Sequence, residues 1–281
     1  MIQDIFPHKL DNSFKNLKPN ENDFAVYFCG DSVLVKEEKD GNYSFTKIGQ
    51  FGSKIKFENY VYMFSVDNER YFLLRNGDRS GFTGECKLLP LSDVRKMKYG
   101  YFKEMYFLIC TAWHLHSWYV DNRFCGRCGR ILIHGESERM LYCKICAAKV
   151  YPRISPAVIV GVINGDKIIM SKYAGRDYKG YALLSGFAEI GETLEQTVER
   201  EVMEEVGVKV KNIKYYKSQP GGIDGNMLAG FFCELDGDDT LTVDKNELAM
   251  ARWFRRDEIP VEDDGFSLTF EMIGKFKNQT F

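Results

Sequence analysis

The sequence has no excess of charge of either sign. Its 281 residues include 38 lysines and arginines against 40 aspartates and glutamates, so the formal net charge is −2. Polybasic and polyacidic classes of protein are therefore excluded. Proteins that bind duplex DNA usually carry a basic excess, and this class is disfavoured, although a local basic groove is not.

Long apolar runs are also missing, and a secretory leader is not expected. The longest apolar stretch, Met105 to Trp113, is far shorter than the roughly 20 residues that span a membrane. The first residues, Met1 to Pro7, do not show a basic segment followed by an apolar one, which is the pattern of a signal peptide. We therefore expect a cytoplasmic protein with no transmembrane segment, in which the 8 cysteines stay reduced.

Length and composition indicate a folded chain with more than one domain. Since a domain has roughly 150 residues, there is room for about two, and an apolar fraction of 44% is enough to form their cores. We predict four regions, which are a β-rich domain at 1–90, a connecting helix at 91–122, a cysteine ribbon at 123–152 and an α/β domain at 153–281.

Local patterns support these regions. The apolar runs predicted to be strands in the first region are Phe24–Phe28, Ser32–Val35, Tyr60–Phe64 and Tyr71–Leu74, separated by Gly, Asn and Asp turns. After Ser92, a typical N-cap, apolar residues including Met97 and Tyr101 recur at helical spacing up to Val120. His114 and His116 fall on different faces of this helix, so they are predicted to be packing residues rather than metal ligands.

Four cysteines have the spacing of a zinc ribbon. Cys125 and Cys128 form one C-x-x-C pair, and Cys143 and Cys146 form a second one. Zinc takes four tetrahedral ligands, and with all four positions filled by protein it would be structural. A thioredoxin-like redox motif is the alternative, but it needs one C-x-x-C in a βαβ context. The remaining cysteines, Cys29, Cys86, Cys110 and Cys233, are predicted to be buried small hydrophobes.

One predicted helix carries most of the functional signal. Thr193 and Gln196 form a capping-box pair and Gly207 stands where a helix ends, so Leu194–Val206 is predicted to be helical. A stripe of valines at every fourth position is expected to pack on a sheet; its members are Val198, Val202 and Val206.

The same helix brings three carboxylates to one face. Glu201, Glu204 and Glu205 fall within roughly 100° of arc, where like charges repel by roughly a few tenths of a kcal/mol per pair. A divalent cation would offset this repulsion, and oxygen-only ligands suit Mg²⁺ or Mn²⁺. Arg200 is placed to pair with one carboxylate and orient it. A solvated acidic face is the alternative.

These residues belong to a longer motif. Gly186, Glu192 and the segment REVMEEVGV from Arg200 to Val208 resemble the Nudix box at every defined position. The resemblance implies an α/β/α sandwich with a mixed sheet and a divalent-metal hydrolase of nucleoside diphosphates linked to another moiety. The expected fold class is therefore α+β and α/β, with a β-rich N-terminal domain, a zinc ribbon and a Nudix domain.

The likeness extends to the NADH pyrophosphatase subfamily. The ribbon and the segments Tyr151–Pro156, Ser218–Pro220 and Glu247–Phe254 resemble that subfamily in order. This implies hydrolysis of NAD(H)-like dinucleotides to NMN(H) and AMP, removal of NAD caps from RNA, and a homodimer. Another Nudix substrate, such as ADP-ribose, FAD or a dinucleoside polyphosphate, stays open. A nucleotide sensor is also open, although a sensor is expected to have lost a box carboxylate.

The resemblance also implies roles for individual residues. The implied Mg²⁺ or Mn²⁺ ligands are Glu201, Glu204, Glu205 and Glu247; Glu192 and Arg200 complete the catalytic set; the implied substrate-binding residues are Phe187, Gln219, Tyr151 and Ala188. Phe187 matches a position whose ring stacks on a base, and a core aromatic is the alternative. Water is the expected nucleophile. The basic loop from Lys172 to Lys179 either attracts phosphates or is merely solvated.

One segment departs from the subfamily. After Ser218-Gln219-Pro220 the subfamily usually continues with Trp-Pro-Phe-Pro, which is associated with dinucleotide selectivity, whereas this chain has Gly221-Gly222-Ile223-Asp224. Stacking of a base on an aromatic ring contributes about 1–3 kcal/mol. The missing aromatic is therefore expected to weaken or redirect recognition of one half of a dinucleotide.

Overall fold

The computed structural model of the chain describes residues 1–50, 57–75, 86–96, 103–176 and 178–280. The chain divides into two compact units. Unit 1 contains Met1–Gln3, Ile154–Gly221 and Gly225–Phe281, and unit 2 contains Asp4–Arg153 and Gly222–Asp224. Among the described residues, no helix is both long and apolar enough to cross a membrane.

Unit 2 contains two β-sheets formed by its N-terminal part. The strands are β1 (Leu10–Asp11), β2 (Phe24–Val26), β3 (Phe28–Cys29), β4 (Ser32–Glu37), β5 (Tyr43–Ser44), β6 (Thr46–Lys47), β7 (Tyr60–Val66), β8 (Glu69–Leu74) and β9 (Cys86–Pro90). One sheet has the order β1-β7-β8-β2-β6, and the other joins β3, β4 and β5, with β9 also on β4. The predicted strands are confirmed, and the first of them is divided between β2 and β3.

The helices of unit 2 lie between these sheets and the cysteine ribbon in sequence. They are α1 (Leu91–Lys96) and α2 (Lys103–Asp121). The predicted helix positions Met97 and Tyr101 lie outside the described residues. Ile109 and Ala112 of α2 are fully buried. His114 and His116 are packing residues as predicted, since the former contacts the Arg153 carbonyl oxygen and the latter packs on Phe28.

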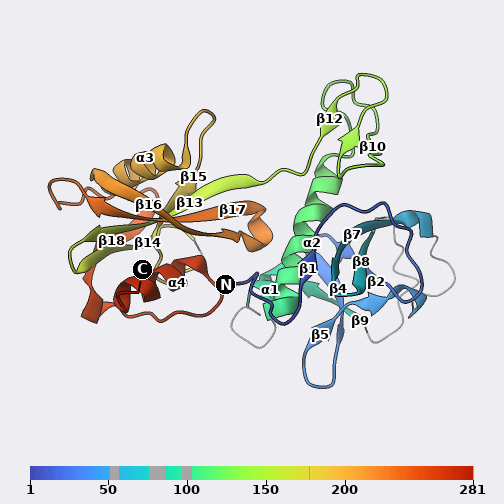
Figure 1. Cartoon of the computed structure of the whole chain (residues 1–281), viewed down its shortest axis with the longest axis horizontal. Helices are drawn as coiled ribbons and strands as arrows, with labels where there is room; N and C mark the ends of the chain where they lie inside the picture. Colours follow the sequence, from blue (N-terminus) through green and yellow to red (C-terminus); the bar gives the residue numbers. More distant parts are fainter. Residues whose placement is uncertain (51–56, 76–85, 97–102, 177, 281) are drawn as a thin grey trace. The chain divides into compact units, whose positions relative to one another are not determined.

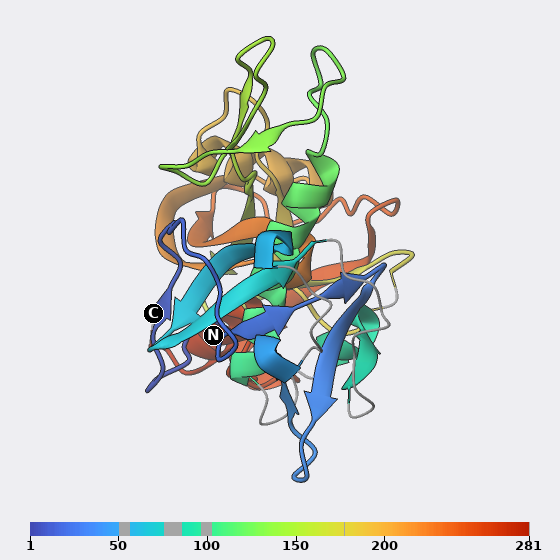
Figure 2. The ribbon, with the colours of Figure 1, turned by 90° about the vertical axis from the view of Figure 1, so that its right-hand side faces the viewer.

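The ribbon follows the C-terminal end of α2 (Figures 1 and 2). Its three-stranded antiparallel sheet consists of β10 (Ile133–His134), β11 (Leu141–Tyr142) and β12 (Lys149–Val150). A small core joins the ribbon to α2, because Cys125, Cys143, Leu132 and Leu141 pack with Trp118.

Unit 1 is built around one mixed six-stranded sheet. Its strands are β13 (Ser155–Asn164), β14 (Lys167–Tyr173), β15 (Leu184–Phe187), β16 (Val210–Pro220), β17 (Asn226–Leu235) and β18 (Leu248–Arg255). The order is β16-β17-β13-β14-β18, with β15 also paired to β13. β13 and β17 are parallel, and the other pairs are antiparallel.

A helix covers each face of this sheet (Figure 1). On one face, Val198, Val202 and Val206 of α3 (Leu194–Val206) are fully buried in a core with β13 and β17 residues, which confirms the predicted valine stripe. On the other face, Met272, Ile273 and Phe276 of α4 (Leu268–Lys277) form a second core. The expected α/β/α sandwich is therefore confirmed.

The first three residues belong to this second core rather than to the sheets that follow them. Met1 packs among the α4 residues. The backbone N–H of Ile2 donates to the Phe266 carbonyl oxygen at 3.0 Å, and the Gln3 side-chain amide donates to the Ser218 carbonyl oxygen at 3.2 Å. The core of unit 1 therefore combines the segment Met1–Gln3 with residues that follow Arg153, although the two are remote in sequence.

The prediction for the cysteines outside the ribbon is half wrong. Cys110 and Cys233 are buried at 2% exposure each, as expected. Cys29 and Cys86 are only half-buried, and each is the terminal residue of its strand, where packing by neighbouring strands ends.

Candidate active site and metal centre

Helix α3 begins and ends at the residues that the sequence predicts. The N–H of Gln196 donates to the Thr193 hydroxyl at 3.2 Å, and the N–H of Thr193 donates to the Gln196 side-chain oxygen at 2.8 Å. At the other end, Gly207 adopts a left-handed conformation with φ 73° and donates to the Met203 carbonyl oxygen. The two caps fix the helical register and with it the direction of every carboxylate on α3.

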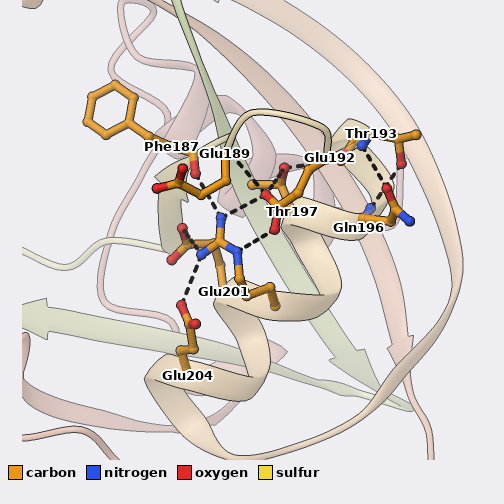
Figure 3. A network of polar contacts seen from close by, with 9 residues as sticks. Phe187, Glu189, Glu192, Thr193, Gln196, Thr197, Glu201 and Glu204 are labelled. Atoms are coloured by element: carbon orange, nitrogen blue, oxygen red, sulfur yellow. Dashed lines mark hydrogen bonds and ion pairs between the residues drawn. The ribbon is translucent and has the colours of Figure 1, made fainter.

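The guanidinium of Arg200 binds three carboxylates, those of Glu192, Glu201 and Glu204, which are labelled in Figure 3. Its guanidinium donates to both carboxylate oxygens of Glu192 at 2.6 and 2.9 Å, and to Glu201 at 2.8 Å and Glu204 at 2.9 Å. It also donates to the carbonyl oxygen of Phe187 at 2.9 Å. The sequence predicts that Arg200 pairs with one carboxylate. In the structure it pairs with three carboxylates and also donates a hydrogen bond to the backbone at the end of β15.

Glu192 holds Arg200 in place from the loop before α3. Besides the guanidinium, its carboxylate accepts bonds from the Thr197 hydroxyl and the Glu189 N–H, each at 3.0 Å. The hydrogen bonds from Arg200 and then from the Glu189 N–H lower the pKa of Glu192 to about 2. Glu192 is therefore ionised at neutral pH and is saturated with donors, which suits an orienting role.

Glu201 and Glu205 are buried carboxyls, while Glu204 is exposed on the same helix. Glu201 is 8% exposed and Glu205 is 2% exposed. Burial, followed by the charges of Glu201 and Glu247, raises the pKa of Glu205 to about 8. Its Oε2 is a buried atom with no hydrogen-bond partner. A buried carboxyl with one oxygen lacking a hydrogen-bond partner, next to further carboxylates, is a costly arrangement that a bound cation would relieve.

Glu247 approaches this cluster from another part of the sheet. It is exposed just before β18, and its carbonyl oxygen accepts a bond from the N–H of Ala174 at 2.8 Å. Its charge raises the pKa of both Glu201 and Glu205. The end of β14 and the start of β18 therefore bring Glu247 toward the α3 carboxylates.

Gly186 allows Glu201 to lie against β15. A Cβ atom at Gly186 would lie 1.9 Å from the Glu201 carboxyl carbon and 2.0 and 2.2 Å from its two oxygens. Any side chain at this position therefore collides with the carboxylate. The glycine at the start of the motif is required by close approach of α3 to the strand.

The carboxylates fit a hard divalent cation by their chemistry. All the donors that Glu201, Glu204, Glu205 and Glu247 offer are oxygens, which suit Mg²⁺ or Mn²⁺. Among the described residues, the four cysteines, and not these carboxylates, form a group of ligand atoms close enough together to hold a metal ion directly. Mg²⁺ keeps several waters in its coordination shell, and these waters bridge longer separations.

The predicted substrate residues of unit 1 differ in their surroundings. Phe187 is 55% exposed at the end of β15, so it is not a core aromatic. The N–H of the next residue, Ala188, donates to the Pro156 carbonyl oxygen at 3.1 Å, which fixes the backbone from which the Phe187 ring projects.

Gln219 is not in a solvent-exposed loop. It lies in β16 and is 5% exposed. Its amide nitrogen donates to the Phe266 carbonyl oxygen at 2.8 Å, and its amide oxygen accepts the N–H of Leu268 at 2.6 Å. These bonds attach the start of α4 to the sheet. A substrate contact by Gln219 stays a prediction that would compete with them.

Tyr151 lies in unit 2. Its ring is 49% exposed, and its hydroxyl donates to Glu138 of the ribbon at 3.0 Å. Its predicted role in substrate binding stays a prediction.

Arg176 is a residue near the carboxylates that the sequence indicates only as part of a basic loop. Its guanidinium lies over the Tyr173 ring, 3.9 Å from the centroid, and its charge lowers the pKa of Glu205 against the effect of burial. The Tyr173 hydroxyl in turn contacts the Ser185 hydroxyl at 2.7 Å. Arg176 is thus a cation on the carboxylate side of β14 without a close ion pair to a described carboxylate.

The four ribbon cysteines converge as the sequence predicts. Their sulfur atoms lie within 4.8 Å of one another, at 3.4 Å for Cys125 to Cys146, 3.5 Å for Cys128 to Cys143 and 3.8 Å for Cys128 to Cys146. Four thiolates around zinc, with Zn–S bonds of about 2.3 Å, are separated by about 3.8 Å. Backbone N–H groups of Cys146 and Ile145 lower the pKa of Cys143. The cluster fits a tetrahedral zinc ion.

Likeness to a known family covers the C-terminal part of the chain. Residues 153–273 match the model of the NUDIX domain, so this part of the chain is a Nudix domain. Among curated proteins, the chain is similar to "NAD-capped RNA hydrolase NudC" of Enterobacter sp. (strain 638), with 39% identity over 147 residues. The protein of the same name from Klebsiella pneumoniae (strain 342) is 40% identical over 148 residues.

These likenesses cover only part of each protein. The alignments span 52% of this chain and 57% of each of the two relatives. Among solved structures, a NUDIX hydrolase from Nitrosomonas europaea has a TM-score of 0.48 at 25% identity, covering 56% of this chain and 91% of that one.

The segment that departs from the subfamily pattern forms a short 3₁₀ helix, Gly222–Asp224, which belongs to unit 2. Gly222 has φ +57°, and a Cβ there would lie 3.0 Å from the Tyr106 hydroxyl of α2. A Cβ at Gly221 would lie 1.2 Å from the Asn226 side-chain oxygen. The glycines therefore allow a close backbone approach that an aromatic residue would not.

Proposed function

We propose that this protein is a metal-dependent pyrophosphohydrolase that splits NAD(H)-like dinucleotides, free or as caps on RNA, into two mononucleotide parts. The observation that carries this proposal is the buried carboxyl of Glu205, whose Oε2 has no hydrogen-bond partner, beside Glu201 and Glu247 in the part of the chain that matches the NUDIX domain. The dinucleotide comes from the relatives, whose name describes hydrolysis of NAD-capped RNA.

In this proposal, Glu201 and Glu205 are the principal ligands of Mg²⁺ or Mn²⁺, and Glu204 and Glu247 complete the set. Bound metal neutralises pyrophosphate oxygens and makes water a stronger nucleophile. Glu192 keeps Arg200 in place. Arg200 in turn holds Glu201 and Glu204 in fixed directions through bonds of 2.8 and 2.9 Å.

The exposed ring of Phe187 provides a surface on which a base stacks. Arg176 faces the same carboxylates as a cation and is suited to neutralise a substrate phosphate. Pyrophosphate cleavage at such a site needs no covalent intermediate, because water is the nucleophile. Zn²⁺ at the four cysteines is structural, and the protein is a homodimer.

A substrate panel tests the proposal. The whole chain is incubated with Mn²⁺ and, in separate reactions, with NADH, NAD-capped RNA, ADP-ribose, FAD and a dinucleoside polyphosphate, and the products are identified by mass spectrometry. We expect NMNH and AMP from NADH. Release of phosphate-containing products from the other compounds alone would support the Nudix chemistry but overturn the substrate. The glycine-rich segment 221–224 is the observation that favours this second outcome.

A matched pair of variants tests the site itself. Glu205→Gln keeps the shape of the side chain and removes its charge, so we expect turnover to fall by at least about 100-fold. Glu199→Gln makes the same change at an exposed position of α3 and should leave turnover within about twofold. Equal activity of the two variants would remove Glu205 from the proposed metal site.

A further inference from the structure

Unit 2 contains a cavity of its own between the end of β8, the C-terminal part of α2 and the ribbon hairpin. Its volume is about 270 Å³, close to the lower end of ligand sites in proteins, which is about 300 Å³. The wall is apolar where Leu73, Leu132 and Leu141 contribute, and the exposed side chains of Val120 and Ile131 form part of its rim. A cavity of this size suits a small molecule.

The polar side chains that the described residues contribute to the lining of the cavity are cationic or neutral, and none of them is a carboxylate. Its polar side chains are those of Arg75, His116, Tyr119, Asn122, Arg123 and His134. Within the described ranges of the chain, neither Arg75 nor Arg123 forms an ion pair with an acidic residue. Two guanidinium groups therefore share one cavity, and no carboxylate of the described residues pairs with them.

The two arginines are exposed, and their like charges repel each other. Partial desolvation, with a further contribution from the charge of Arg123, lowers the pKa of Arg75. Burial and then Arg75 lower the pKa of His134 to about 4, so this imidazole is neutral at pH 7. Arg75 donates to its Nε2 atom, which leaves the proton of neutral His134 on Nδ1.

Compensation of the α2 dipole does not account for the two arginines. Cations near a helix C-terminus are stabilised by the last carbonyl groups. In α2 the Trp118 carbonyl oxygen is already bonded by the backbone and side-chain N–H groups of Asn122, at 3.1 and 2.8 Å. Neither Arg75 nor Arg123 donates to a carbonyl of α2 among the contacts of the described residues.

We infer that this cavity binds a phosphate monoester, with its phosphate between Arg75 and Arg123 and its organic part against the apolar rim at Val120 and Ile131. Guanidinium groups bind phosphate oxygens in pairs through parallel N–H bonds. The ring of Tyr119, which lies 5.0 Å from that of His134, adds an aromatic wall. A nucleoside monophosphate has this combination of a dianion and a compact ring.

Calorimetric titration of the whole chain with AMP, inorganic phosphate and adenosine, in the absence of added Mg²⁺ or Mn²⁺, tests the site. We expect AMP to bind and adenosine not to bind. Binding of AMP alone identifies a nucleotide site, and equal binding of inorganic phosphate identifies a site for phosphate itself. Failure of both to bind would overturn the inference.

Paired variants assign the binding to this cavity. The double variant Arg75→Gln with Arg123→Gln should weaken AMP binding by at least tenfold. Arg127→Gln removes the same charge from an exposed ribbon position outside the cavity and should leave the affinity within twofold. Unchanged affinity in the double variant, or an equal loss in the control, would contradict the assignment.

A second measurement covers the case in which the double variant does not fold. In the wild-type chain, AMP should slow amide hydrogen exchange in residues 116–134 more than in residues 4–37. Protection confined to unit 1 would place the ligand at the Nudix domain and overturn the inference.

Discussion

At the scale of single residues, the site depends on two residues in unusual surroundings. Glu205 is a carboxyl buried without a hydrogen-bond partner for Oε2, and Gly186 is a strand residue whose missing side chain makes room for the Glu201 carboxylate. Both features cost stability or restrict the sequence. Residues that lower the stability of the folded protein are typical of ligand-binding and catalytic sites.

The raised pKa of Glu205 predicts how the stability of the metal-free protein changes with pH. An unfolded glutamate has a pKa near 4.3, whereas the folded group titrates at about 8, so the folded state binds the proton more tightly. This contribution to stability is present at low pH and is lost as pH rises between these two values. Glu205→Gln should therefore be more stable than the wild type at pH 8 by about 1–3 kcal/mol.

Thermal unfolding without divalent cations, at several pH values between 5 and 8, measures this difference. The gap between Glu205→Gln and the wild type should widen with pH, and Mn²⁺ should close it by stabilising the wild type alone. Glu199→Gln provides the control for loss of a charge on α3. A gap that is independent of pH would contradict the assignment of the raised pKa to Glu205.

Gly186→Ala is predicted to displace the Glu201 carboxylate. The added methyl group overlaps that carboxylate at 1.9 Å, so we expect a loss of about 1–3 kcal/mol of stability and a large fall in kcat. A double-mutant cycle with Glu201→Ala isolates the contact. In the Glu201→Ala background the glycine substitution should cost little, and additive effects would show that the collision is not the cause.

At the scale of secondary-structure elements, local signals predict α3 but not α4. Thr193, Gln196 and Gly207 all lie within the chain segment that they cap, so the bounds Leu194–Val206 are readable from the sequence. Helix α4 begins after Ser267, whose side chain makes no capping bond. The cap comes instead from Gln219 of β16, which accepts the N–H of Leu268.

The site shows the same contrast between local patterns, which could be predicted from the sequence, and contacts between remote segments, which could not. The carboxylate face of α3 follows from helical periodicity, and the cysteine cluster follows from spacing. The pairing of Arg200 with Glu192 depends on how separate segments fold together. The approach of Glu247 does so too, and only the family resemblance, not a local pattern, predicts it. The burial of Gln219 likewise depends on α4, which is remote in sequence.

Gln219→Leu is predicted to release the start of α4. The substitution removes two buried hydrogen bonds and leaves the N–H of Leu268 without a partner, which costs about 1–3 kcal/mol. Hydrogen exchange should speed up in residues 266–272, and KM for the dinucleotide should change by less than about twofold. A large rise in KM with unchanged exchange would instead support the substrate contact that the sequence resemblance predicts.

At the scale of the whole molecule, the ribbon is predicted to depend on zinc while the Nudix domain does not. Cys143 is fully buried in the small core with Trp118, Leu132 and Leu141. Cys143→Ser should lose bound zinc, because a structural site needs all four thiolates. Unit 2 should unfold at a lower temperature, while exchange protection of β13 and β17 in unit 1 persists.

Zinc stoichiometry by atomic absorption and hydrogen exchange of each unit measure these outcomes. Cys86→Ser, a change of a half-buried cysteine outside the ribbon, is the control and should keep zinc at one per chain. Retained zinc and unchanged melting of Cys143→Ser would overturn the structural-zinc site.

The membership of Met1–Gln3 in unit 1 has a consequence for the order of events during synthesis. These residues are synthesised before Asp4–Arg153, whereas their partners Ser218 and Phe266 are synthesised after it. The entropic cost of closing a loop rises by only about 0.6 kcal/mol for each doubling of the loop length, so the long separation is tolerated. The sheets and ribbon of unit 2 can therefore fold on the nascent chain before Met1–Gln3 find their partners. The core that contains Met1 forms only after Ser218 and Phe266 have been synthesised.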